Sequence, residues 1–513
     1  QLQAEAPFTK RSAEWLINGK ATSHEALALQ HRLHRIAAQT GRLEKLDAAI
    51  TGIRAASASG IKVPRNSEIN DRISRLKSEL NLNEGQTLTG QAWVTHQSVQ
   101  QALKPETVLI DFIRLQIPTE LSDDQRKESR YVAWITSAGE EPVQIIDIGP
   151  AGHIDAQINA ASKELQSSVA LIVSQGEAKA TEACSAALKQ LSRKLWSPLP
   201  DSVKQARNII ISPDASLWLV PWTALPAQGE LLIRSHQFRF VVSGRDLISS
   251  DETASANAPL IVADPDFETK VSAPVQSSAS PAIETRGTAN FKNFSPVPRL
   301  KFAAAEAASI TPAIEQLCGR PPVVLTGKQA TEQSVKAASS PEIMVLTTHG
   351  IFLPTDNDAT ASEFTFDSGS RSELNNPLLR SGLLFAGFNQ SSTGSAGVLT
   401  GAEILETDLE HTDLVVMSAC DTALGEINNG EGVAGLRQSF QLAGVNSVVA
   451  SLWKIEDRQT AFLMKDFFEY LAAGKTKSEA LRQAQLNRIQ SRQERNGAAH
   501  PFFWAAFTLT GSD

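Results

Sequence analysis

The feature that most constrains the fold is a regular alternation of two hydrophobic patterns that begins at residue 105. Short runs rich in β-branched and aromatic residues, such as TVLIDFIRLQI and RYVAWITSA, are bounded by proline, glycine or charge and predict strands. Longer stretches with apolar residues at three- and four-residue spacings lie between the later runs and predict helices. Strands that alternate with helices favour a mainly parallel sheet covered by helices on both faces.

The same patterns divide the chain into three parts. Residues 1–104 have helical periodicity, which fits either an ordinary helical cap or the end of upstream helical repeats. Residues 105–250 form a first α/β unit, in which short strands are also expected in SLWLVPW and LLIRS. The polar run DETASANA then opens residues 251–513, which hold a second α/β unit. Because the chain starts QLQAEAPF without methionine, we expect it to be a piece of a longer protein that lacks its upstream domains.

Composition limits the partners and the compartment. The net charge of −8 argues against a nucleic-acid or anionic-membrane binder, which would be basic. No apolar run approaches the ~18 residues needed to span a membrane. The cysteines are odd in number and too few for a disulfide framework, which favours the reducing cytoplasm: Cys184, Cys318 and Cys420.

Two segments of the second unit read as long loops. Residues 270–298 and 355–376 are dense in serine, threonine, asparagine, aspartate, glycine and proline. Loops of this length inside a compact domain are usually functional lids or disordered segments. We therefore expect both to be mobile and open to proteolysis.

Two predicted strands of the second unit end in reactive side chains. The run IMVLTT leads directly into His349 and Gly350, and the run DLVVMSA leads into Cys420 and Asp421. Ligands bind at the carboxyl ends of strands in an open parallel sheet, so both reactive residues are expected at the same end. A cysteine nucleophile needs a nearby base and backbone N–H groups for the oxyanion. A lone cysteine or histidine is more often structural, and their joint occurrence leaves both interpretations open.

Motifs for metal and nucleotide cofactors are missing. The sequence has no HExxH, no CxxC pair, no GxSxG and no GxGxxG. The stretch GKQAT at 327–331 lacks the glycine spacing of a phosphate-binding loop and reads as a helix start. The stretch GEG at 430–432 is interpreted as the start of a helix. We therefore expect neither a cofactor nor a metal.

Four ordered blocks of the second unit resemble the CHAT domain, a caspase-like peptidase family related to separase. They are LTTHG, LVVMSACDTALG, GEGVAGLRQSFQLAGVNSVVASLWKIED and HPFFWAAFTLTG, and SPDASLWLVPWTAL in the first unit also fits. The resemblance covers about residues 258–513. It implies a caspase–hemoglobinase-like fold, in which the first unit is similar to the degenerate protease-like unit that precedes the active one in separase-like enzymes. It also implies tetratricopeptide repeats upstream.

The resemblance further implies a Cys–His dyad. Its histidine is His349 and its cysteine nucleophile is Cys420, with the backbone N–H groups of Gly350 and Cys420 as the oxyanion hole. Asp421, Trp453 and Lys454 are expected beside the substrate. An acidic residue follows the tryptophan in the similar separase motif, whereas Lys454 would repel a basic substrate side chain. The residue before the cut is therefore expected to be neutral or acidic, and an apolar pocket selecting a leucine-like residue is the alternative.

These observations predict a cytoplasmic cysteine endopeptidase that cleaves a specific protein. Bacterial defence or cell-death signalling is the role that the resemblance implies, with an upstream sensor domain or an activating partner. Two alternatives stay open: a catalytically silent scaffold that mediates protein contacts, and a zymogen whose dyad aligns only when a partner binds.

Overall fold

A computed structural model describes the fold over most of the chain. The described residues are 6–20, 93–117, 128–248, 257–270, 296–352, 380–391, 396–418, 426–428, 432–453 and 455–513. Both predicted loops fall largely outside them, as do Cys420, Asp421 and Lys454. Of the predicted N-terminal helical region, the structure describes α1 (Ala6–Gly19) and α5 (His96–Ala102).

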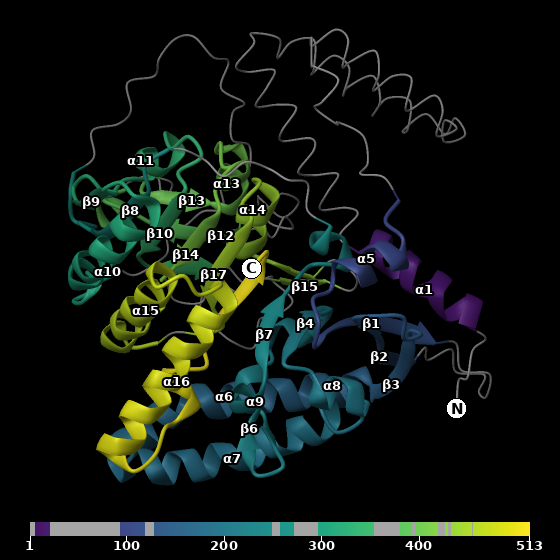
Figure 1. The fold of residues 1–513 in the computed structure, drawn as a ribbon. Coiled ribbons are helices and arrows are strands. Elements are labelled where there is room, and N and C mark those ends of the chain that lie inside the picture. The colour runs from purple at the N-terminus through teal and green to yellow at the C-terminus, as the bar shows by residue number, and fades with distance from the viewer. Residues whose placement is uncertain are drawn as a thin grey trace, which may run out of the picture.

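One sheet runs through the described part of the molecule (Figure 1). Its eleven strands lie in the order β3 (Gln144–Pro150), β2 (Glu128–Ser137), β1 (Thr107–Ile117), β4 (Asn208–Ser212), β7 (Gln237–Phe240), β18 (Phe507–Gly511), β17 (Ser447–Ser451), β14 (Leu414–Met417), β10 (Ile343–Thr347), β8 (Leu260–Pro265) and β9 (Val323–Gly327). The two predicted α/β units therefore contribute neighbouring halves of a continuous sheet.

Nine of the eleven strands form two parallel blocks that run in opposite directions, and β2 and β3 extend the sheet at one edge. The first block is β1, β4, β7 and β18, and the second is β17, β14, β10, β8 and β9. The direction reverses where β18 pairs antiparallel with β17, and β2 is antiparallel to both β1 and β3. The predicted mainly parallel sheet is confirmed, and the carboxyl ends of the two blocks face opposite ways.

Helices pack on both halves of the sheet, as the alternating pattern predicts. The first half is covered by α6 (Ala151–Gln175) and α7 (Glu177–Leu195), with α8 (Asp201–Gln205) nearby. In the second half α10 (Ala303–Cys318), α15 (Asp457–Ala472) and α16 (Lys477–Asn496) form one packed layer. The shorter helices α11 (Glu332–Lys336), α13 (Gly401–Glu406) and α14 (Leu436–Leu442) lie across the sheet from this layer (Figure 1).

The two halves share a core and a buried ionic link. The C-terminal strand β18 lies between them, coloured yellow at the centre of Figure 1. Glu177, at the start of α7, accepts hydrogen bonds from Arg492 of α16 at 2.6 and 2.7 Å, and from the backbone N–H of His500 at 2.8 Å. A carboxylate held by several donors from the far end of the chain fixes one half against the other.

Small elements differ from the sequence prediction or add to it. The run SLWLVPW is a 3₁₀ turn (Ala215–Leu219) instead of a strand, and LLIRS is mainly the short helix α9 (Leu232–Ser235). Apolar runs this short carry no clear period, so tertiary packing decides their conformation. The remaining strands form small sheets: β5 (Pro226–Ala227) with β6 (Glu230–Leu231), β11 (Gly350–Phe352) with β12 (Ser381–Leu384) and β13 (Val398–Thr400), and β15 (Glu426–Asn428) with β16 (Gly432–Ala434).

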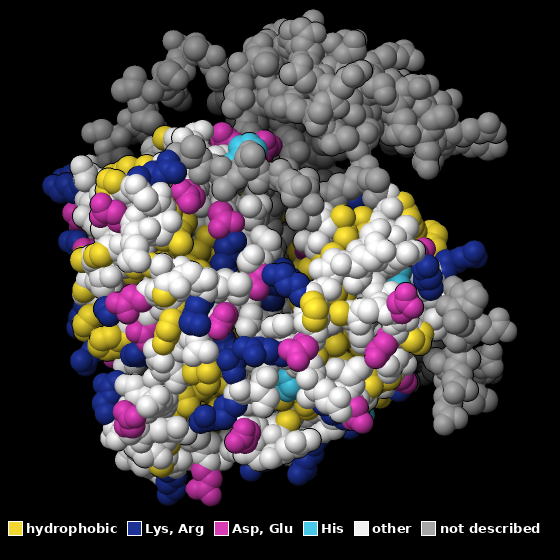
Figure 2. Space-filling model, in the orientation of Figure 1, with side chains coloured by type: hydrophobic (Ala, Val, Ile, Leu, Met, Phe, Trp, Pro, Cys, Tyr) yellow, Lys and Arg dark blue, Asp and Glu magenta, His cyan; other side chains and the backbone are white. Residues whose placement is uncertain are grey.

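The visible surface carries charges of both signs. On the face in Figure 2, lysine and arginine side chains are interspersed with aspartate and glutamate rather than gathered in one field. A mixed surface of this kind exerts little long-range attraction on a ligand of either sign. Among the helices that the structure describes, none has the length and apolar content to cross a membrane.

Candidate functional site

The candidate site lies at the carboxyl end of the second block, where β10 and β14 run side by side. The two strands are parallel neighbours, with Leu346 opposite Met417, and the N–H of Ser418 donates to the carbonyl of Leu346 at 2.9 Å. His349 follows Leu346 by three residues, and Cys420 follows Met417 by three residues in the sequence. Cys420 and Asp421 themselves are outside the described residues.

His349 is held on both its backbone and its ring. Its carbonyl accepts a hydrogen bond from the N–H of Leu384 in β12 at 2.9 Å. Its ring packs against Phe267 with centroids 5.6 Å apart, and Nε2 lies 2.8 Å from the carbonyl oxygen of Pro298. A carbonyl can only accept, so Nε2 carries the proton, and in the neutral imidazole Nδ1 bears the lone pair. This tautomer suits a histidine that acts as a base through Nδ1.

The Pro298 carbonyl is fixed by its neighbours. Val297 exchanges two hydrogen bonds with the Asn389 side chain, at 2.9 and 3.0 Å. Arg299 forms an ion pair with Asp264, and its Nε donates to that carboxylate at 3.0 Å. Both anchors flank Pro298, so the carbonyl that orients His349 does not depend on a single contact. The sequence offered no signal for this role, because a backbone carbonyl belongs to every residue.

Gly350 is the first residue of β11, where it pairs with Leu383 of β12. The chain therefore enters the small sheet β11–β12–β13 at the residue after His349. Whether the N–H of Gly350 serves an oxyanion, as the resemblance implies, stays a prediction.

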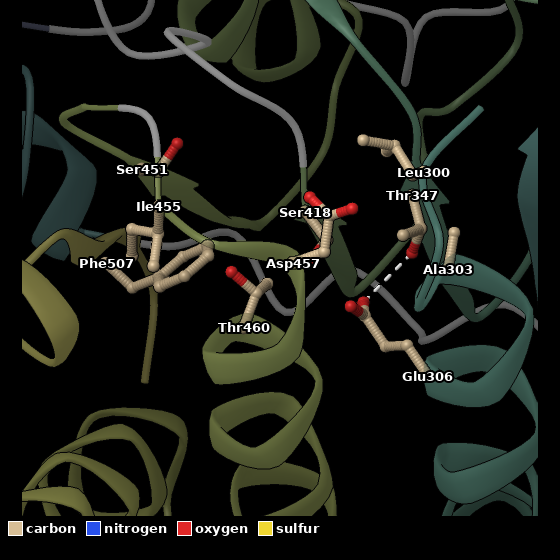
Figure 3. Close-up of a pocket in the computed structure, with 10 residues that line it drawn as sticks. All are labelled: Leu300, Ala303, Glu306, Thr347, Ser418, Ser451, Ile455, Asp457, Thr460 and Phe507. Carbon is tan, nitrogen blue, oxygen red and sulfur yellow. Dashed lines mark hydrogen bonds between the residues drawn. The ribbon is translucent and has the colours of Figure 1, made fainter. Parts of the chain in front are cut away.

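A small cavity of about 20 Å³ opens between the ends of three strands of the second block (Figure 3). That volume is close to what one water molecule occupies. Its lining comes from the ends of β10, β14 and β17, from the start of β18, and from in and just before the first turns of α10 and α15: Leu300, Ala303, Glu306, Thr347, Ser418, Ser451, Ile455, Asp457, Thr460 and Phe507.

Glu306 is, with Asp457, one of two acids among the described residues that line this cavity. It lies in the first turn of α10, is 1 % exposed, and accepts a hydrogen bond from the Thr347 hydroxyl at 2.9 Å (Figure 3). Burial raises the pKa of Glu306 to about 7, the hydroxyls of Ser418 and Thr347 lower it, and Asp457 raises it. An acid whose pKa is shifted by burial towards neutrality marks a candidate functional position.

The sequence did carry a signal for Glu306. Ala303 and Ile310 lie three residues before and four residues after it, and both are buried apolar residues on the same face of α10. An acid on the apolar face of a predicted helix is a buried polar group that needs an explanation.

Of the three predicted substrate-binding residues, Asp421, Trp453 and Lys454, the structure describes Trp453, and it lies in the core. Trp453 is 2 % exposed, and its indole N–H donates to the carbonyl of Phe502 at 3.1 Å within the main core. Lys454 is outside the described residues. Ser451, Ile455 and Asp457, from the same connection between β17 and α15, line the cavity.

Two other cysteines are poor nucleophiles. Burial raises the pKa of both Cys184 and Cys318 to about 12, so almost no thiolate forms near neutral pH. Within the described residues, no group of three or more histidine, cysteine, aspartate or glutamate side chains is placed to hold a metal ion.

Known proteins resemble this chain over different spans. Tetratricopeptide repeat protein 28 of Mus musculus is 27 % identical over 209 residues, which are 39 % of this chain and 8 % of that protein. The protein of the same name from Homo sapiens is 31 % identical over 116 residues, 23 % of this chain and 4 % of its own length. The chain thus spans less than a tenth of the length of these relatives.

Solved structures match with low TM-scores. The Saccharomyces cerevisiae separase–securin complex at 2.6 Å has a TM-score of 0.43 and 8 % identity, covering 81 % of this chain and 31 % of that chain. The Arg-specific cysteine proteinase gingipain R has a TM-score of 0.35 and 10 % identity, covering 66 % of this chain and 68 % of that one.

The match to a protein family is broader. The family model of the CHAT domain matches residues 185–512, from the middle of α7 to the end of β18. This span exceeds half of the chain and reaches into the first α/β unit, further towards the N-terminus than the residues that the sequence motifs indicated. The chain belongs to the CHAT domain family.

Proposed function

We propose that this chain is a cysteine endopeptidase in which Cys420 is the nucleophile and His349 the general acid–base. The observation that carries the proposal is the pairing of β10 with β14. Both strands run parallel as neighbours, and His349 and Cys420 follow their last paired residues by the same number of positions. CHAT family membership and the sequence motifs around both residues support it.

The orientation of His349 suits this role. Because Nε2 donates to the Pro298 carbonyl, Nδ1 has the lone pair that takes the proton from the Cys420 thiol. The thiolate sulfur attacks the scissile carbonyl carbon, and the backbone N–H groups of Gly350 and Cys420 receive the oxyanion. His349 then donates the proton to the leaving amine, which departs as the C–N bond breaks. Water hydrolyses the thioester and restores the thiol.

The substrate is proposed to be a specific protein, recruited by a sensor domain or an activating partner. The tetratricopeptide-repeat relatives support an arrangement in which repeats accompany the CHAT domain. Defence or cell-death signalling in the cytoplasm is the biological role we infer. If Lys454 borders the substrate, as the sequence predicts, its charge favours a neutral or acidic residue before the cut.

An electrophilic peptide probe tests the chemistry without a known substrate. The full chain is incubated with a peptidyl acyloxymethyl ketone library, and the modified residue is located by mass spectrometry. A stoichiometric adduct on Cys420 is expected, and its loss in His349→Ala identifies the base.

Matched controls come from the same chain. Cys184→Ser and Cys318→Ser are expected to leave the adduct unchanged, because burial keeps both thiols protonated. Cys420→Ala should remove the adduct with little change in melting temperature. If Cys420 reacts no faster than the other two cysteines, the proposal of an active endopeptidase is wrong for this chain, and the silent scaffold or the partner-dependent zymogen takes its place.

A further inference from the structure

Glu306 is a buried carboxyl that the proposed hydrolysis does not use. It is 1 % exposed and points from α10 into the cavity at the carboxyl end of the second block (Figure 3). No described lysine, arginine or histidine forms an ion pair with it. Burying an acid is unfavourable unless partners compensate, so its neighbours indicate what it does.

Those neighbours belong to the two strands that lead to the proposed dyad. The Thr347 hydroxyl, at the end of β10, donates to Glu306 Oε1 at 2.9 Å. The Ser418 hydroxyl, just beyond β14, borders the same cavity and lowers the pKa of Glu306. It is buried and makes no hydrogen bond of standard geometry with a described residue. Thr347 precedes His349 by two residues, and Ser418 precedes Cys420 by two.

We propose that Glu306 is a positioning residue: its carboxylate, hydrogen-bonded to Thr347 and sharing a cavity with the buried hydroxyl of Ser418, which is unpartnered among the described residues, draws the ends of β10 and β14 together and so sets the approach of His349 to Cys420. The inference rests on the Cys–His dyad of the proposed function. Glu306 touches neither substrate nor reacting atoms. An ionised carboxylate accepts from both hydroxyls, and hydrogen bonds to an ionised acceptor are roughly twice as strong as those of the neutral acid, so loss of the Glu306 proton strengthens the link to both strand ends.

The groups around Glu306 make this role depend on pH. Thr347 from β10 and Ser418 from the end of β14 face it with neutral hydroxyls, and α15 contributes Thr460 and the charged Asp457. Burial raises the pKa of Glu306 to about 7, so the carboxylate forms as the pH rises through neutrality. The hydrogen-bonded link that Glu306 makes between the ends of β10 and β14 is therefore expected to strengthen as the pH rises through about 7.

The test measures the rate at which iodoacetamide alkylates Cys420 in the full chain between about pH 5.5 and 8.5, with the site read by mass spectrometry. The variants are Glu306→Gln, which cannot ionise, and Thr347→Val, which removes the hydroxyl at nearly constant shape. The ratio of the wild-type rate to the Glu306→Gln rate is expected to rise through about pH 7 to roughly tenfold, the effect of one hydrogen bond. Thr347→Val should slow alkylation by a similar factor above pH 7.

Glu332 provides the matched control. Burial also raises the pKa of Glu332 to about 7, but Glu332 starts α11, and its carboxylate accepts the N–H of Gly397, just before β13, at 2.9 Å instead of lining the cavity. Glu332→Gln should leave the Cys420 rate within a factor of about two at every pH. Melting temperatures establish that each variant is folded.

The outcomes separate this inference from the proposed function. If His349→Ala slows alkylation but Glu306→Gln and Thr347→Val match the wild type, the dyad stands and the role of Glu306 is wrong. If His349→Ala has no effect, the dyad and the positioning role both fall. A loss in Glu306→Gln that is the same at all pH values would mean a structural role only, and would also overturn the proposal.

Discussion

The carboxyl ends of the two parallel blocks treat buried charge in opposite ways. At the first block, Lys20 from the end of α1 donates to the carbonyls of Ser212 and Pro213 at 2.9 and 3.1 Å and lies 3.6 Å from the Asp111 carboxylate. At the second block, Glu306 meets hydroxyl groups, and no described cation pairs with it.

The two blocks differ in how the buried charge at their carboxyl ends is compensated. Asp111 and Ser212 are the last register partners of β1 and β4, so the side chain of Lys20 lies where the pairing of these two strands ends. Burial lowers the pKa of Lys20 and raises the pKa of Asp111, while the charge of each partner opposes that change. At the first block the buried Asp111 is paired with Lys20. At the second block lie His349 and Glu306, and the pKa of Glu306 is raised to about 7. Repeating an α/β arrangement thus does not repeat its chemistry.

The largest expected effect is the loss of peptide cleavage when His349, at the carboxyl end of the second block, is replaced. His349→Ala should lower the rate of peptide cleavage by ~10²–10⁴-fold, because it removes the residue that we propose as the general acid–base. Cleavage of a fluorogenic peptide library, read as initial rate, is the measurement. A wild-type rate in this variant would contradict the assignment of the second block as the active end.

The next effect concerns stability at the first block. Lys20→Met leaves Asp111 buried without its cation, and we expect a loss of about 3–5 kcal/mol in the free energy of unfolding. Urea unfolding measures it. Lys20→Met combined with Asp111→Leu should recover most of the loss, because the orphaned charge is gone.

An exposed pair on α15 serves as the control for that comparison. Lys465 and Glu469 lie 2.7 Å apart with side chains about half exposed, so Lys465→Met should change the unfolding free energy by less than about 0.5 kcal/mol. If Lys20→Met and Lys465→Met lower the free energy of unfolding equally, burial does not make the Lys20–Asp111 pair more important for stability.

A third prediction uses the pH dependence of stability at the second block. The pKa of Glu306 is raised from 4.5 to about 7 in the folded chain, so its contribution to stability is present below pH 4.5 and lost as the pH rises through 7. Glu306→Gln lacks this loss. The variant should therefore gain stability relative to the wild type between about pH 5 and 8, by up to about 3 kcal/mol. Urea unfolding at several pH values checks the sign, and a constant difference would contradict it.

The smallest effect is substrate preference at the active end. Lys454 should disfavour arginine or lysine before the cut by about tenfold, and Lys454→Glu should reverse that preference. A peptide-library cleavage profile of both forms is the measurement. Strong selection for basic residues by the wild type would move the specificity to an acid such as Asp421.

Much of the fold followed from local patterns. The alternation of strand and helix periods predicts a mainly parallel sheet, and the apolar runs before His349 and Cys420 predict strands that end at the same edge of it. That these two strands are neighbours was shown by the structure. Such strands can be recognised in the sequence as continuous apolar runs, because each strand of a covered sheet is buried on both faces. The short stretch LLIRS was wrong as a strand, since it is mainly the helix α9. An apolar run this short does not distinguish a strand from a helix.

The sequence by itself determined which residues are buried along each element and which side chains follow the strand ends. The tertiary structure alone decided that β18 joins the two blocks and reverses the direction of the sheet, so that their carboxyl ends face opposite ways. It alone brought the Pro298 carbonyl to His349 across 51 residues and Glu306 to Thr347 across 41. Periodicity records which side of a segment avoids water, but it holds no information about the partner that covers that side. That choice is made by contacts between distant segments, where packing and hydrogen bonding are satisfied together.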